Sequence, residues 1–60
     1  MFIENEWLGN RELMLKRLHN GNYEVLDSDD NYNRAFVGDY GECKEYMHQQ
    51  YIEYEEERIG

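Results

Sequence analysis

The sequence contains no proline and no threonine, and it has a single cysteine, Cys43, and a single serine, Ser28. A lone cysteine cannot form a disulfide within the chain. Together with the lack of a signal-peptide pattern, it indicates a reducing, cytoplasmic setting. Ser28 has no supporting motif around it, so the chain offers no hydroxyl nucleophile of a catalytic triad.

Long apolar runs, glycine-rich phosphate loops and zinc-type spacings are lacking as well. No stretch is long enough to span a bilayer, and His19, Cys43 and His48 do not follow a standard zinc pattern. A chain of 60 residues also has little room for a pocket of the size that enzymes use. We therefore expect a protein that is not an enzyme and that uses no metal or cofactor.

Acidic residues dominate the charge, since 14 Asp and Glu stand against 6 Lys and Arg, for a net charge of −8. Such a chain repels phosphate backbones and anionic lipid, so we expect neither direct nucleic-acid binding nor membrane binding. A protein with a basic surface, such as a nucleic-acid-binding cleft, is the favoured partner. The alternative is that the charge only keeps a small protein dispersed.

The small size of the chain favours self-association. Residues 1–60 form a single domain whose core is of marginal size. Natural domains this small are commonly supplemented by disulfides, a metal or a partner subunit. Because the first two have no support here, we expect a homodimer. The 6 Tyr, 3 Met and 1 Trp are types that interfaces favour, although they also build cores.

The clearest local signal is Asn20-Gly21, which stands between two apolar-rich runs. Asn-Gly is typical of a two-residue type I′ hairpin turn, because that turn needs two positive φ angles. In the corresponding register Leu18 pairs with Tyr23, and Arg17 faces Glu24 as a cross-strand pair of opposite charge.

The C-terminal segment predicts an amphipathic helix. Asp39 and Glu42 have the spacing of a capping box. Beyond them, one helical face at spacings i, i+3, i+4, i+7, i+8 and i+11 carries Cys43, Tyr46, Met47, Gln50, Tyr51 and Tyr54.

These patterns predict an α+β fold, in which a small antiparallel sheet (βββ) packs on one C-terminal α-helix. We expect the sheet over residues 12–38, the helix over residues 40–57, and an N-terminal arm or edge strand over residues 1–10. The alternative is an αββα order with residues 11–19 helical, because this segment is rich in good helix formers. The core or a dimer seam is expected to use Trp7, Tyr46, Met47, Tyr51 and Tyr54, with Val25, Phe36 and Val37 as partners on the sheet.

The carboxylates outside the apolar stripe are the candidate binding site. They can pair with lysine or arginine on a partner, in place of the phosphates that such residues bind elsewhere. On the helix they are Glu45, Glu53, Glu55, Glu56 and Glu57. A second patch lies in the polar turn before the third strand and consists of Asp27, Asp29 and Asp30. The alternative interpretation is a solvated surface without a binding role.

Two further features are interpreted as structural. Asp and Asn alternate over residues 27–33 as at the start of a calcium-binding loop, but Tyr32 replaces the glycine and Gly38 the final glutamate of that loop. These residue types are also the ones that turns favour. Cys43 lies on the apolar stripe and has acidic neighbours, so we expect a buried, unreactive thiol.

The passage from residue 20 to residue 46 resembles a pattern of short phage-encoded and prophage-encoded proteins, in which strands joined by an Asn-Gly turn lead into a helix. The entry to the helix reads Gly38-Asp39-Tyr40-Gly41-Glu42-Cys43-Lys44-Glu45-Tyr46. The resemblance covers under half of the chain and transfers no functional residue. It implies a class of small acidic proteins of the host-takeover or anti-defence type, several of them homodimers, which inhibit by binding.

We therefore expect a non-catalytic inhibitor that binds a host or antiviral-defence protein through an acidic and aromatic surface, with nucleic-acid mimicry as one route. It would act in the cytoplasm of the host cell. Two alternatives remain open at this point: a small structural or assembly protein whose role is self-association, and a small ligand-sequestering module.

Overall fold

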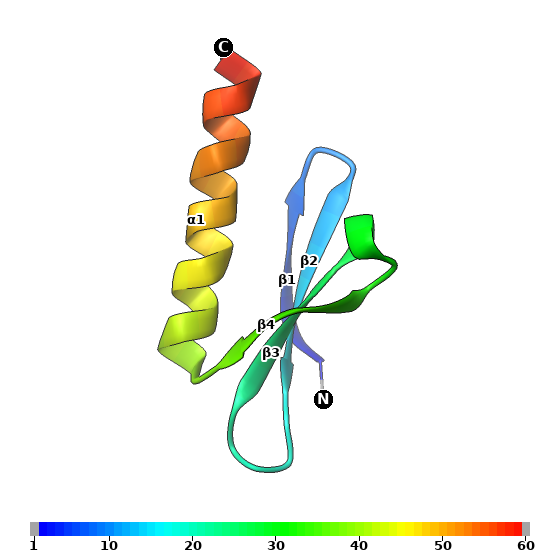
Figure 1. Cartoon of the computed structure of the whole chain (residues 1–60), viewed down its shortest axis with the longest axis vertical. Helices are drawn as coiled ribbons and strands as arrows, with labels where there is room; N and C mark the ends of the chain where they lie inside the picture. The colour runs from blue at the N-terminus through cyan, green and yellow to red at the C-terminus, as the bar shows by residue number, and fades with distance from the viewer. Residues whose placement is uncertain (1, 60) are drawn as a thin grey trace.

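A four-stranded antiparallel sheet and one long helix make up the computed structural model of the chain, which describes residues 2–59. In chain order the elements are β1 (Phe2–Leu8), β2 (Arg11–Arg17), β3 (Tyr23–Asp27), the 3-10 helix η1 (Ser28–Asp30), β4 (Asn33–Gly38) and α1 (Tyr40–Ile59). The strands lie side by side in sequence order, and α1 runs along one face of the sheet (Figure 1). The α+β prediction is confirmed, and β1 supplies a fourth, edge strand.

Residues 11–17 form a strand because their apolar side chains alternate. Leu13 and Leu15 are fully buried, whereas Met14 between them is half-buried and lies on the other face. A period of two suits a strand with one covered face and does not suit a helix. The alternative of a helix over residues 11–19 is therefore wrong.

The β2–β3 hairpin is present, but its turn is longer than predicted. Residues 18–22 form the connection, in which the Leu18 N–H donates to the Asn22 carbonyl at 2.8 Å and the Gly21 N–H donates to the Leu18 carbonyl at 3.2 Å. Gly21 has a φ of 88°, but Asn20 is not among the residues with positive φ, so the turn is not type I′. The Asn20 side chain instead accepts from the Asn22 N–H at 3.0 Å, which stabilises the wider loop.

The longer turn shifts the register by one residue. Arg17, rather than Leu18, lies opposite Tyr23, and Lys16, rather than Arg17, lies opposite Glu24. The predicted pairings were wrong for this reason. The shift also decides which side chains face the helix, because neighbouring strand residues point to opposite faces.

The β1–β2 connection is a tight turn at Gly9-Asn10. Leu8 lies opposite Arg11 in the register, which leaves two residues in the loop. Gly9 has a φ of 67°, the conformation that a type II′ turn requires at its first central position. The turn aligns β1 so that Leu8 faces the helix and is only 3% exposed.

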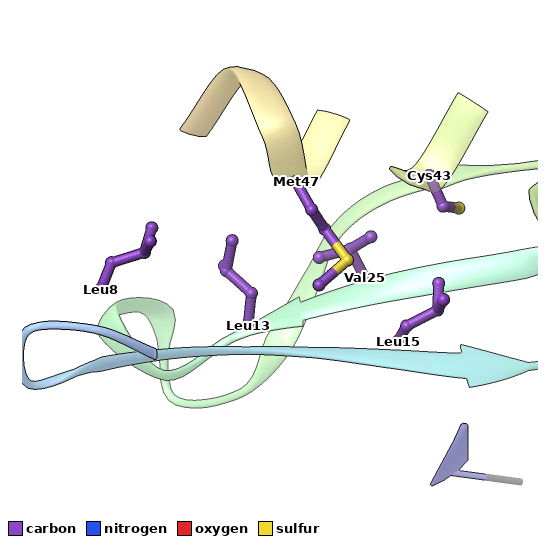
Figure 2. Packing of buried hydrophobic residues seen from close by; sticks show 6 residues of the cluster. All are labelled: Leu8, Leu13, Leu15, Val25, Cys43 and Met47. Carbon is purple, nitrogen blue, oxygen red and sulfur yellow. The ribbon is translucent and has the colours of Figure 1, made fainter. Parts of the chain in front are cut away.

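The core lies between the sheet and α1, and its side chains come from one face of the sheet and one stripe of the helix (Figure 2). Its buried members are Leu8, Leu13, Leu15, Val25, Cys43 and Met47. Tyr23, Phe36, Tyr46 and Tyr54 are half-buried and pack against them. The six buried side chains among the described residues make a small core, as the chain length implies.

The capping box predicted for the helix start is present. The Glu42 N–H donates to the Asp39 carboxylate at 2.8 Å, and the Asp39 N–H donates to the Glu42 carboxylate at 2.9 Å. Both bonds satisfy backbone N–H groups that lack a partner within the helix. The helix then continues to Ile59, two residues further than predicted, and Arg58 pairs with Glu55 in its last turn.

Three predicted core residues are exposed instead. Tyr51 is 43% exposed and lies beside Glu6 of β1, at the edge of the helix, rather than on the core. Trp7 and Val37, at 60% and 44% exposed, point to the face of the sheet that α1 does not cover. The prediction that these three join the core of the single chain was wrong, while Met47 is buried and Tyr46 and Tyr54 pack on the core as expected.

Candidate functional site: the acidic outer face of α1

The side of α1 that points away from the sheet carries a row of glutamates. Successive helical residues are rotated by about 100° and rise by about 1.5 Å. Side chains at positions i, i+3, i+11 and i+14 therefore fall on one side of the helix, over about 21 Å. We call this row the outer stripe, and it consists of Glu42, Glu45, Glu53 and Glu56. All four are exposed, as is Glu57 on the flank of the stripe.

The ion pairs formed within the described residues lie away from the outer stripe. Arg11 pairs with Asp27, Arg34 with Glu24, Lys44 with Glu4, and Arg58 with Glu55. Within residues 2–59 no ion pair reaches Glu45, Glu53, Glu56 or Glu57.

Glu55, also predicted for the binding surface, is different, because its carboxylate is half-buried and lies 3.1 Å from the Arg58 guanidinium.

A hollow of about 390 Å³ adjoins the outer stripe where α1 meets β4. Its floor is an aromatic pair, since the rings of Phe36 and Tyr46 stack with centroids 5.0 Å apart and an angle of 11° between their planes. Glu42, Glu45 and Gln49 complete its lining. An aromatic face beside two carboxylates is a suitable environment for the cationic group of a lysine or arginine side chain.

The contribution of Phe36 to this hollow was not predicted, nor was that of Gln49. In the sequence Phe36 is one apolar residue of a short strand, and the ring that it meets lies ten residues later on the helix. An irregularity between β3 and β4 makes the contact possible, because it places Phe36 opposite Val25 and Arg34 opposite Leu26. No sequence signal marks that bulge.

A second hollow, of about 320 Å³, lies on the other flank of α1, toward β1. Glu6, Lys44, His48 and Tyr51 line it. The Lys44 ammonium pairs with Glu4 across this flank, and the hydrogen bond from Lys44 to that carboxylate raises the pKa of the lysine. This flank therefore carries charges of both signs, in contrast to the outer stripe.

The predicted second acidic patch is divided by the fold. Asp29 and Asp30 are exposed in η1, but Asp27 is 8% exposed and its carboxylate accepts three hydrogen bonds from Arg11. These bonds, more than any other contact, hold the pKa of Asp27 below its ordinary value. Asp27 is therefore part of the structural framework, and its prediction as a partner-binding residue does not agree with its burial.

The remaining acids of the patch also lie apart from the helix. η1 lies in the connection between β3 and β4, apart from α1 (Figure 1). Asp29 and Asp30 therefore do not extend the outer stripe, and the protein presents two separate acidic surfaces.

Cys43 is fully buried at the helix start, with Sγ 3.8 Å from the Gly38 carbonyl oxygen. Burial raises the pKa of its thiol, and the neighbouring Asp39 and Glu42 carboxylates act in the same direction. A buried thiol with a raised pKa is a weak nucleophile.

Over residues 2–59 no three His, Cys, Asp or Glu side chains are placed to hold a metal ion together. Asp27, the first residue of the calcium-like alternation, accepts from Arg11 and from the Asp29 N–H at 3.0 Å. Within the same residues no helix is long and apolar enough to cross a membrane.

Three comparisons with known proteins found no match to this chain. No protein-family model matches the sequence, no curated protein matches it, and no solved structure matches the fold.

Proposed function

We propose that the protein is a non-catalytic inhibitor that binds a basic surface of a host or antiviral-defence protein through the outer stripe of α1. The observation that carries the proposal is the combination of unpaired, exposed carboxylates with the aromatic hollow beside them. Phosphate-binding surfaces on proteins are built from lysine and arginine, which also pair with carboxylates. The complementary partner is therefore a cationic protein surface.

Two kinds of contact support the docking. Lysine and arginine side chains of the partner would pair with Glu45, Glu53 and Glu56 along the stripe. One cationic group would enter the hollow, lie against the Tyr46 ring, and meet the Glu45 carboxylate at its rim. The first contact supplies long-range attraction, and the second supplies a defined position along the partner.

The length of the outer stripe suits competition with nucleic acid. At a rise of about 1.5 Å per helical residue it covers about 21 Å, the length of roughly six phosphates along one DNA strand. A protein that holds this row of charges in its DNA-binding cleft cannot bind DNA there at the same time. Inhibition by occupancy needs no catalytic group on this chain.

The test is affinity capture from host cells with a matched pair of variants. Glu53→Gln/Glu56→Gln removes two charges from the stripe, and Asp29→Asn/Asp30→Asn removes two from η1. We expect wild type and the η1 variant to retain one specific partner, and the stripe variant to lose it. We also expect capture to weaken between about 0.05 and 0.5 M salt, because exposed charges are screened over a shorter distance at higher salt.

Duplex DNA provides the test of mimicry, since it should displace the captured partner. Capture that is equal for both variants and indifferent to salt would contradict binding through the outer stripe. A partner that DNA does not displace would exclude mimicry while leaving the electrostatic contact in place. Circular dichroism of both variants provides the folding control, and we expect no change because all four substituted carboxylates are exposed.

A further inference from the structure

The face of the sheet that points away from α1 is uncovered, and we call it the open face. Residues 2–59 supply no second layer for it (Figure 1). Side chains that alternate with the buried ones point to it, and its apolar members are Trp7, Met14, Leu26 and Val37. Trp7, the only tryptophan of the chain, is 60% exposed there, which is high for so large an apolar side chain.

The charge of the open face differs from that of the rest of the molecule. It carries Lys16 and Arg34 beside Glu12 and Glu24, so acids and bases balance on a chain whose net charge is −8. The acids are also engaged within the chain, because Glu24 accepts from Arg34 at 2.8 Å and Glu12 accepts from Tyr32 at 2.7 Å. Two copies of the chain therefore repel each other least when these faces meet.

We propose that a second copy of this chain covers the open face, as a two-fold symmetric dimer that packs sheet against sheet. The inference is independent of the proposed inhibitor function. The two-fold axis runs parallel to the strands, midway between β2 and β3. It places each residue of β2 across from the β3 residue of the second copy that is its partner in the register. Met14 then faces Leu26 of the second copy, and Lys16 faces its Glu24.

The register therefore makes the open face complementary to itself. Met14 and Leu26 meet at the centre, and beside them Lys16 meets Glu24, a charge of opposite sign. Face-to-face packing of two sheets about 10 Å apart is a common way to bury such surfaces. It also leaves α1 of each copy on the outside, so the dimer presents two outer stripes on opposite sides.

Sedimentation velocity and the fluorescence of Trp7 test the dimer. We expect the wild type to reach twice the 7.4 kDa of one chain, with Trp7 emission shifting to shorter wavelength as the concentration rises. Met14→Lys should raise the dimer dissociation constant at least about tenfold, because it places a charge at the centre of the interface. Ile59→Lys adds the same charge at an 81% exposed site on α1, and should change the constant less than about twofold.

A charge exchange tests the orientation. Lys16→Glu alone places like charges opposite each other, and so does Glu24→Lys alone. Mixed together, the two variants should form a heterodimer in native mass spectrometry, because both contacts then join opposite charges. Circular dichroism of each variant confirms that the monomers are folded.

Three results would overturn the proposal. One is a wild type that stays monomeric at all concentrations. Another is a Met14→Lys variant that dimerises as the wild type does. The third is a mixture of the Lys16→Glu and Glu24→Lys variants that forms no more heterodimer than chance.

Discussion

Arg11 holds Asp27 in a bidentate pair, in which Nε donates to Oδ1 at 3.0 Å and to Oδ2 at 3.2 Å, and Nη2 donates to Oδ2 at 2.6 Å. The pair connects the start of β2 to the end of β3, and the Arg11 guanidinium also donates to the Gln50 side chain of α1 at 3.2 Å. It therefore fastens the sheet to the helix at the end of the core that lies near η1. Bidentate pairs of this kind combine charge with fixed geometry.

Replacing Asp27 should destabilise the fold. We expect Asp27→Asn to lower the free energy of unfolding by about 1–3 kcal/mol, because the half-buried Arg11 guanidinium loses its charged partner. Urea denaturation followed by circular dichroism measures the change. The double variant Arg11→Met/Asp27→Leu should lose less stability than the sum of the losses in Arg11→Met and in Asp27→Leu, since it leaves no unpaired charge. Additive losses would show that the pair contributes no coupling.

The same pair predicts a loss of stability in acid. Hydrogen bonds from Arg11 lower the pKa of Asp27 from its ordinary 3.8 in the folded state. A depressed folded-state pKa stabilises the protein above the unfolded-state value, and the contribution disappears as the pH falls through the folded-state value. The stability difference between wild type and Asp27→Asn should therefore be constant near neutral pH and shrink below about pH 4. A difference that stays constant down to pH 2 would contradict this assignment.

Gly9 should tolerate substitution less well than Gly21. Both have positive φ, at 67° and 88°, so alanine is strained at either position. A Cβ at Gly9 would also lie 3.0 Å from the Tyr54 hydroxyl oxygen, whereas a Cβ at Gly21 meets nothing within 4 Å.

We expect Gly21→Ala to lower the free energy of unfolding by about 1 kcal/mol and Gly9→Ala to lower it further. Adding Tyr54→Phe should recover part of the extra loss at Gly9 and none at Gly21. Equal losses for the two glycines would mean that Tyr54 moves aside at no cost.

Cys43 should be unreactive in the folded protein. Its side chain is fully buried, and burial raises the pKa of the thiol, so little thiolate is exposed to a reagent. We expect alkylation by iodoacetamide to be slower by at least about a hundredfold than in denaturant, with a rate that follows unfolding. Mass spectrometry at timed intervals measures it. Rapid alkylation of the native protein would show that the helix start opens easily.

The sequence alone predicts the secondary structure where interactions between residues close in the chain determine it. The capping box at Asp39 and Glu42 predicted the helix start to the residue, because both bonds form between neighbours in the chain. Asn20-Gly21 predicted the hairpin, and the charge imbalance predicted an acidic surface on the helix. None of these depends on a distant residue.

The tertiary structure decided the rest. The length of the β2–β3 turn set the register, and a shift of one residue exchanges the faces of a strand. Arg11, on the neighbouring strand β2, donates hydrogen bonds to Asp27, so this carboxylate is not part of the predicted acidic surface.

A single helix covers only one side of a four-stranded sheet, so Trp7 and Val37 became exposed although their residue types suit a core. Local sequence determines which elements form. Burial depends on which surfaces meet, and it is decided only when β1 to β4 and α1 come together.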